Sequence, residues 1–236
     1  MDEAALKAWR KAERERLVAA RLAVAPAQLE DWRQAIDAHL ERAFPGLARG
    51  LIAFCWPFKN EYDARFLARR LRERGARTAL PVVVGPRQPL QFRLWAPGDA
   101  LALGVYDIPY PAQGEAVLPD AALVPMNGFD ERGYRLGYGG GFFDRTLAAL
   151  RGRGGDKPVA IGVTFELARL PSIHPQQYDI PMDYVATERG VYARGAEGLA
   201  LLEAPRGGAA PSGYASPACL AHEIAPGYFG PGAKPD

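Results

Sequence analysis

The sequence predicts an α/β protein with three layers, in which helices cover both faces of a mainly parallel sheet. Short apolar runs with the length of buried strands, at 51–56 and 78–84, flank a helical stretch at about 61–74. This strand–helix–strand order is typical of parallel pairing. A third apolar run at 122–126 leads through a glycine-rich loop into another helical stretch at about 142–150. The order therefore recurs along the chain.

Two helices are expected before the first strand. Residues 3–23 are rich in Ala, Leu, Arg and Glu and contain no Gly or Pro. This composition favours a helix, although its apolar stripe is thin and much of it should face water. Pro26 separates it from a second helix at about 27–44. In that helix, apolar residues recur every three or four positions and build one buried face: Leu29, Trp32, Ile36, Leu40 and Phe44.

The remaining strands and a tail complete the predicted organisation. The run at 91–95 alternates as a partly exposed strand does, and 158–165 and 184–188 have the pattern of the last strands. The segment 205–236 holds six Pro and six Gly in 32 residues, and it has too few aliphatic residues to build a core. We therefore expect one α/β domain over 1–204 and a flexible tail over 205–236.

The composition argues against several classes of protein. The 236 residues carry a formal net charge of +2, which is too small to indicate a nucleic-acid surface. No apolar run approaches the roughly 20 residues of a membrane span, and the charged N-terminus lacks the apolar core of a signal peptide. Cys55 and Cys219 stand in no metal-ligand spacing. These features predict a reduced, soluble, cytoplasmic protein. We expect it to be a monomer whose partners are small molecules, without membrane or nucleic acid.

The clearest functional signal is the glycine-rich loop RLGYGGGFFD, from Arg135 to Asp144. Glycines let the backbone approach a ligand closely, and the free N–H groups at a helix start favour an anion. Arg135 can add a bidentate phosphate contact, and Asp144 is placed to hold the Mg²⁺ that travels with ATP. The loop has neither the Lys-Ser/Thr ending of a Walker A motif nor the GxGxxG spacing. The alternative is a tight packing turn.

The run VPMNGFDERGYRLGYGGGFFDRTL at 124–147 resembles the signature of the 5-formyltetrahydrofolate cyclo-ligase family, also called methenyltetrahydrofolate synthetases. Weaker matches extend over 7–192 and leave the tail outside. The resemblance implies the Rossmann-like cyclo-ligase fold and an ATP- and Mg²⁺-dependent ligase of folate one-carbon metabolism. Such enzymes close 5-formyltetrahydrofolate to 5,10-methenyltetrahydrofolate. The γ-phosphoryl group passes to the formyl oxygen, N10 of the folate displaces it, and ADP and phosphate leave.

The resemblance also implies where ATP binds. Lys7 and Arg10, on the first predicted helix, would reach its phosphates, and Lys7 and Arg135 would act in catalysis. The remaining ATP contacts would come from the loop: Leu136, Gly137, Tyr138, Gly139, Gly140, Gly141, Phe142 and Phe143. For Lys7 and Arg10 the alternative is a solvated helix face, which is common for isolated basic residues.

Metal and folate contacts are implied in the same way. Asp144 and Asp183 would ligate Mg²⁺, with a polar residue at a strand entry as the alternative for Asp183. Glu61 matches the family's folate-contacting Glu, which pairs with the amide and amine edge of the pterin. Its alternative is a Glu favoured by the dipole in the first turn of a helix. The expected folate contacts are Glu61, Trp56, Tyr138 and Phe142.

Several positions depart from the family pattern. Phe142-Phe143 stands where Tyr-Tyr is usual, and Tyr62-Asp63-Ala64 stands where Val-Asp-Thr is common. Further departures are Asp107, Tyr110, Glu166 and Tyr178. The phosphate side matches better than the folate side. Two alternatives therefore remain: a related enzyme that binds ATP and acts on another substrate, and a non-catalytic module that binds a nucleotide or a pterin.

Overall fold

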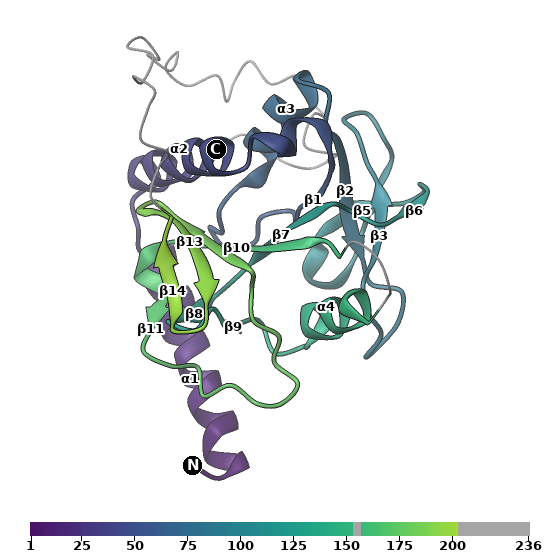
Figure 1. The fold of residues 1–236 in the computed structure, drawn as a ribbon. Coiled ribbons are helices and arrows are strands. Elements are labelled where there is room, and N and C mark those ends of the chain that lie inside the picture. Colours follow the sequence, from purple (N-terminus) through teal and green to yellow (C-terminus); the bar gives the residue numbers. More distant parts are fainter. Residues whose placement is uncertain (153–156, 203–236) are drawn as a thin grey trace, which may run out of the picture.

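A nine-stranded mixed sheet forms the centre of the molecule in the computed structural model (Figure 1). The structure describes residues 1–152 and 157–202, so the predicted domain boundary at 204 and the tail at 205–236 lie outside the described residues. The helices are α1 (Glu3–Leu22), α2 (Pro26–Ala43), α3 (Ala64–Glu73) and α4 (Phe142–Arg151), with short 3-10 turns η1 (Pro45–Arg49), η2 (Val105–Asp107) and η3 (Glu166–Ala168). Within the described ranges, no helix combines the length and apolar character that crossing a membrane requires.

The strands of the large sheet follow the order β14-β13-β12-β10-β7-β1-β2-β3-β6. Their bounds are β1 (Leu51–Ala53), β2 (Arg77–Val82), β3 (Gln91–Leu94), β6 (Ala116–Val117), β7 (Ala121–Pro125), β10 (Val159–Val163), β12 (Tyr184–Thr187), β13 (Gly190–Gly195) and β14 (Gly198–Leu201). The five strands from β12 to β2 are parallel to one another, and antiparallel strands flank them on both sides. The prediction of a mainly parallel α/β sheet is confirmed.

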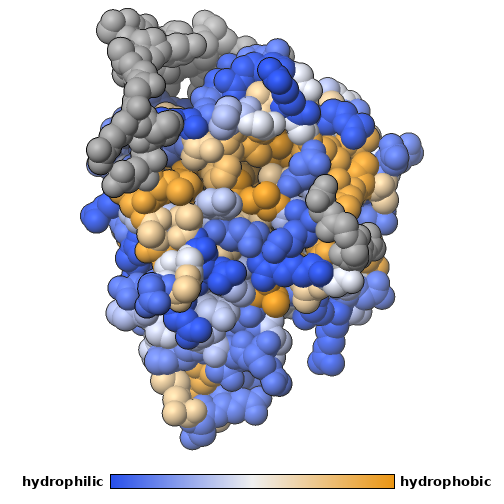
Figure 2. All heavy atoms as spheres, in the orientation of Figure 1, coloured by the Kyte–Doolittle hydropathy of each residue, from blue (hydrophilic) through white to orange (hydrophobic). Residues whose placement is uncertain are grey.

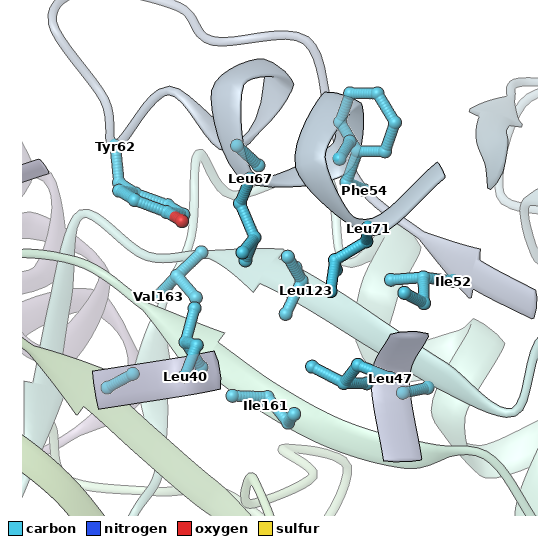
Figure 3. Close-up of a cluster of buried hydrophobic side chains, with 14 of the residues drawn as sticks. Leu40, Leu47, Ile52, Phe54, Tyr62, Leu67, Leu71, Leu123, Ile161 and Val163 are labelled. Carbon is cyan, nitrogen blue, oxygen red and sulfur yellow. The ribbon is translucent and has the colours of Figure 1, made fainter. Parts of the chain in front are cut away.

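Helices cover both faces of this sheet, as predicted. Figure 3 shows side chains of α2 and α3 meeting those of the sheet, with Leu40 and Leu67 close to Ile161 and Leu123. On the opposite face, Leu147 of α4 belongs to a second buried cluster. Alternate residues of the parallel strands supply the two clusters, which explains why those strands read as continuous apolar runs. Each fully buried Leu or Ile contributes about 1.5–3 kcal/mol.

The expected end of the sheet at residue 188 is wrong. The chain continues as the antiparallel hairpin β13–β14, which turns between Gly195 and Gly198. Much of this hairpin is exposed or half-buried, so its sequence lacks the apolar run that marks the central strands. A hairpin at a sheet edge needs little core and leaves a weak hydrophobic pattern.

The third helix begins later than predicted, at Ala64 instead of residue 61. The Asp63 carboxylate caps it by accepting a hydrogen bond from the backbone N–H of Arg65. Before this cap, Lys59 and Asn60 have φ angles of 50° and 57°, which no helix contains. Glu61 therefore lies in a loop, and the alternative that explained it by the dipole of a first helical turn is wrong.

Part of the segment between β7 and the glycine-rich loop forms a small second sheet. Strands β8 (Gly128–Asp130) and β9 (Arg135–Leu136) pair as a hairpin, and β11 (Arg169–Leu170) joins β8. The carboxylate of Asp130 holds the turn by accepting N–H bonds from Arg132 and Tyr134, both at 3.0 Å. This hairpin fixes the direction in which the chain enters the glycine-rich loop.

Helix α1 packs on this small sheet. Leu17 is 1% exposed and shares a buried cluster with Leu136, Leu170 and Ile173. The approach is close at Gly128, where a Cβ atom would lie 2.8 Å from Cδ1 of Leu17. Farther towards the N-terminus the helix protrudes, and the same region of Figure 2 is mostly hydrophilic. Its inner half is thus held beside the glycine-rich loop.

Candidate active site

In the structure the glycine-rich loop is shorter than the predicted segment 135–144: it spans residues 137–141 and connects β9 to α4. Gly139 and Gly141 have φ angles of 95° and 63°, and Gly141 is the left-handed residue that starts α4. Residues with a Cβ atom rarely adopt such angles. A Cβ at Gly141 would also lie 2.8 Å from Nη1 of Arg145. The glycines therefore shape the loop directly at the start of a helix, where ligands of parallel sheets bind.

Arg135 and Asp144 form an ion pair at the base of this loop. Nη2 of Arg135 donates to Oδ2 of Asp144 at 2.7 Å, and Oδ1 of Asp144 accepts the backbone N–H of Ile180 at 3.2 Å. Arg135 is 8% exposed, and its buried Nε has no hydrogen-bond acceptor among the described residues. A buried donor without a partner costs free energy. The pair is neutral overall, and Arg135 keeps an unused donor at Nε.

Arg14, which the sequence reasoning missed, contacts the loop from α1. Its Nε donates to the carbonyl oxygen of Gly137 at 2.7 Å. On the other side, Nη2 of Arg145 donates to the carbonyl oxygen of Gly140 at 2.5 Å. Burial lowers the pKa of Arg14, and the charge of neighbouring Arg10 lowers it further. The loop lies between two arginines, as expected for a segment that binds a polyanion.

Arg10 lies one helical turn before Arg14, and its guanidinium is already engaged. It donates to the Asp179 carboxylate at 2.5 Å and to the carbonyl oxygen of His174 at 2.9 Å. These bonds fasten the segment 173–179 to α1. Lys7 lies one turn farther out on the same face and is exposed. The ATP contacts expected for Lys7 and Arg10 stay predictions.

The structure does not bring Asp183 to Asp144. Asp183 accepts the backbone N–H of Ala160 at 2.9 Å and a bond from Arg151 at 3.2 Å. Arg151 is the last residue of α4, and Asp144 lies in its first turn. These two positions are about 10 Å apart along the helix axis. Asp183 thus braces the amino end of β10, on the side of the sheet away from the loop.

Asp179 is a further acidic residue in this region, and its carboxylate is bonded to Arg10. It directly precedes Ile180, whose backbone N–H binds the Asp144 carboxylate. Within the described part of the chain, no group of three or more His, Cys, Asp or Glu side chains forms a metal cluster. A Mg²⁺ ion at this loop would therefore need phosphate oxygens and water for most of its ligands, which is the usual coordination of Mg²⁺ with nucleotides.

Glu61 faces the glycine-rich loop from the other side. Oε1 of Glu61 accepts the hydroxyl of Tyr138 at 3.1 Å, and Oε2 accepts the backbone N–H of Phe58 at 3.0 Å. The Tyr138 hydroxyl also accepts a bond from Nη2 of Arg21 at 3.1 Å. Burial raises the pKa of Glu61, while the charge of Arg21 and these hydrogen bonds oppose the rise. Glu61 therefore presents a carboxylate that accepts hydrogen bonds beside the loop.

Three aromatic residues, Phe58, Tyr106 and Tyr138, form an aromatic patch next to Glu61. The rings of Phe58 and Tyr106 stack with centroids 5.6 Å apart, and Phe58 meets Tyr138 edge-on at 5.7 Å. Tyr106 is 63% exposed. Exposed stacked rings beside an acid suit a flat heterocycle with hydrogen-bond donors at its edge. Tyr138 belongs both to this patch and to the glycine-rich loop.

Trp56 and the two phenylalanines have structural contacts of their own. Trp56 is 8% exposed and packs against Trp95 in the core, so the structure does not bring it into the aromatic patch. The Arg145 guanidinium lies over the Phe142 ring at 5.3 Å, and that of Arg135 lies over Phe143 at 5.4 Å. Both rings support the arginines at the loop. A phenyl ring is sufficient for this contact, so the contact does not require a tyrosine hydroxyl.

The chain is similar to known proteins over most of its length. The model of the 5-formyltetrahydrofolate cyclo-ligase family matches residues 6–188. The chain is 29% identical over 178 residues to the 5-formyltetrahydrofolate cyclo-ligase of Escherichia coli K12, covering 73% of this chain and 96% of that protein. It is 36% identical over 151 residues to the protein of that name from Mycolicibacterium smegmatis, covering 58% and 73%.

Two solved structures share the fold. The 5,10-methenyltetrahydrofolate synthetase of Aquifex aeolicus superposes with a TM-score of 0.66 at 24% identity, covering 84% of this chain and 99% of that one. The 5,10-methenyltetrahydrofolate synthetase of Mycoplasma pneumoniae superposes with a TM-score of 0.61 at 22% identity, covering 76% and 98%. The three-layer architecture is therefore one that such synthetases adopt.

Proposed function

The chain belongs to the 5-formyltetrahydrofolate cyclo-ligase family, and from this premise we propose that it converts 5-formyltetrahydrofolate into 5,10-methenyltetrahydrofolate at the expense of ATP. The observation that carries the proposal is the meeting of two half-sites at Tyr138. One half-site is the arginine-flanked glycine loop, and the other is Glu61 with the aromatic patch. A ligase that joins a nucleotide reaction to a folate reaction needs both within reach of each other.

The positive groups around the glycine-rich loop support the proposal that ATP phosphates bind there. Arg14, Arg135 and Arg145 supply cations around the loop, and the N–H groups at the start of α4 add a partial positive charge. In the proposed reaction the γ-phosphoryl group moves to the formyl oxygen, and its negative charge spreads over the transferred oxygens. Preorganised arginines stabilise this charge without a covalent enzyme intermediate. N10 of the folate then attacks the activated formyl carbon, and phosphate leaves.

Magnesium fits this half-site as the companion of the triphosphate. Asp144 is the carboxylate closest to the loop in sequence, and it lies in the first turn of α4. One or two carboxylates together with phosphate oxygens are the usual protein ligands of Mg²⁺. When bound, the ion would neutralise phosphate charge and orient the leaving group. The proposed metal residue is therefore Asp144.

The folate half-site follows from hydrogen-bond complementarity. An ionised Glu61 can accept the paired amide and amine donors at the edge of a pterin, and bidentate bonds of this kind are strong and directional. The aromatic patch offers faces for the pterin ring. To bind both donors, Oε1 of Glu61 has to exchange its bond from Tyr138 for one from the substrate.

A spectroscopic assay tests the proposed function. The purified chain is incubated with 5-formyltetrahydrofolate, ATP and Mg²⁺, and the absorbance of the methenyl product is followed. We expect product to form only when both substrates are present, with one ADP released for each methenyl group. ATP binding without any methenyl formation would instead favour the related enzyme with another substrate. Binding with no turnover of any folate would favour the non-catalytic module.

Arg14 and Arg16 provide a matched pair on one helix. Arg14→Gln removes a charged donor at the loop and should lower kcat/KM for ATP by about tenfold to a hundredfold, the range for a lost charged hydrogen bond. Arg16 bonds to Glu13 on the exposed face of α1, so Arg16→Gln should change kcat/KM by less than about twofold. Steady-state kinetics at saturating folate compare the two. Equal effects of both substitutions would contradict a phosphate contact by Arg14.

A further inference from the structure

The loop that carries Glu61 has an unfavourable backbone. Lys59 and Asn60 are consecutive non-glycine residues with left-handed φ angles of 50° and 57°. Such residues persist only where surrounding contacts hold them in place. On the N-terminal side of Glu61, Nε of Arg21 donates to the carbonyl oxygen of Lys59 at 2.8 Å. A second contact that fixes the loop backbone lies on the C-terminal side of Glu61, at Tyr62.

Tyr62 supplies that fixed point. Its side chain is 4% exposed and lies in the buried cluster beneath α2 and α3 (Figure 3). The Tyr62 hydroxyl donates to Oδ1 of Asp37, on α2, at 2.5 Å. Burial raises the pKa of Tyr62 well above its ordinary value, and the Asp37 carboxylate raises it further. The phenol therefore stays a protonated donor over the whole physiological range.

The Asp37 carboxylate is held in place by two arginines and accepts the Tyr62 hydroxyl bond with its other oxygen. It is 3% exposed, and its Oδ2 accepts bonds from Nη1 of Arg33 at 2.5 Å and Nη2 of Arg70 at 3.0 Å. The two arginines come from α2 and α3, so the carboxylate links both helices. A buried carboxylate is tolerated only when it is paired and hydrogen-bonded in this way. Tyr62 is thus attached to the rigid layer that covers the sheet.

We propose that Tyr62 is a positioning residue for folate binding, and that its bond to Asp37 fixes Glu61 in the orientation that accepts the substrate. Tyr62 points to α2, and the preceding Glu61 points to Tyr138. Rotation of the loop that breaks one contact therefore disturbs the other. The inference rests on the proposed function.

Tyr62→Phe tests the inference because it removes only the hydroxyl. We expect KM for 5-formyltetrahydrofolate to rise roughly tenfold, the loss expected for one hydrogen bond to a charged group. KM for ATP should change by less than about twofold. Without any ligand, amide hydrogen exchange should become faster at residues 58–61 while α2 and α3 keep their protection. A purely structural role would lower protection throughout the helices and affect both substrates alike.

Tyr192→Phe is the matched control. Tyr192 also directs its hydroxyl to a carboxylate, that of Glu166 at 3.4 Å, but it lies on β13. The Tyr192→Phe substitution should leave KM for 5-formyltetrahydrofolate, KM for ATP and the amide hydrogen exchange at 58–61 unchanged. Unchanged exchange at 58–61 in Tyr62→Phe would overturn the positioning role, even with an active wild-type chain. Failure of the wild-type chain to form methenyl product would overturn the proposed function separately.

Discussion

Replacing Asp144 with Asn is expected to lower kcat by roughly a hundredfold to a thousandfold, the range for removing one preorganised charge from a phosphoryl-transfer site. The carboxylate holds Arg135 at 2.7 Å and is the proposed Mg²⁺ ligand at the start of α4. Asn keeps the size and one oxygen acceptor for the Ile180 N–H. The fold should therefore survive, while the charge that orders the arginine and the ion is lost.

The control for this substitution is Asp183→Asn. Asp183 contacts Arg151 and the amino end of β10, so kcat and the dependence of rate on Mg²⁺ should stay within about twofold of wild type. Turnover measured across a range of Mg²⁺ concentrations, with thermal unfolding of both variants, separates the two carboxylates. Equal loss of turnover in both variants would contradict the assignment of the metal site to Asp144.

Glu61→Gln should have the second large effect, a fall of about a hundredfold in kcat/KM for 5-formyltetrahydrofolate. Gln keeps the shape of the side chain but loses the charge, and it offers one acceptor where the pterin edge needs two. The affinity for ATP should stay close to wild type, because the glycine loop keeps its arginines. Kinetics with each substrate varied in turn, together with calorimetric ATP binding, measure the difference.

The pH dependence of KM for folate is an independent test of the proposed role of Glu61. Burial raises its pKa, and the ionised form is the one that accepts the pterin donors. KM for folate should therefore rise as the pH falls through this raised pKa, at a higher pH than for an ordinary Glu. Glu61→Gln should flatten that profile. Glu188→Gln is the control, because Glu188 also accepts a backbone N–H, that of Glu166. A wild-type profile without this step would contradict the role of Glu61.

The architecture was predictable because burial on both faces leaves a direct mark on composition. The strands β1, β7 and β10 are apolar runs, since their alternate residues enter two cores. The hairpin β13–β14 was not predictable in this way, because an exposed edge hairpin has no such run. The start of α3 was misplaced because left-handed angles at Lys59 and Asn60 leave no pattern in residue type.

The candidate site was predictable in part. The glycine loop with Arg135 and Asp144 is contiguous in sequence, so its local order indicated its chemistry. Arg14 was missed because the choice among basic residues of one helix depends on how α1 packs. That packing is set by Leu17 against the small sheet. Asp183 was grouped with Asp144 because the family resemblance implied both as Mg²⁺ ligands. In the structure Asp183 contacts Arg151, the last residue of α4, whereas Asp144 lies in the first turn of that helix.

Tyr138 physically connects the two proposed half-sites. Its hydroxyl joins Glu61 and Arg21, while its backbone belongs to the glycine loop. A nucleotide that moves the loop would also move Tyr138. The hydrogen bond from Tyr138 is the one that Glu61 has to give up in order to bind folate. Thermodynamic linkage then requires that folate change the affinity for nucleotide by the same factor as nucleotide changes the affinity for folate. If the proposed sites hold, one phenol would couple the binding of the two substrates, with a sign set by whether the occupied loop keeps or releases Glu61.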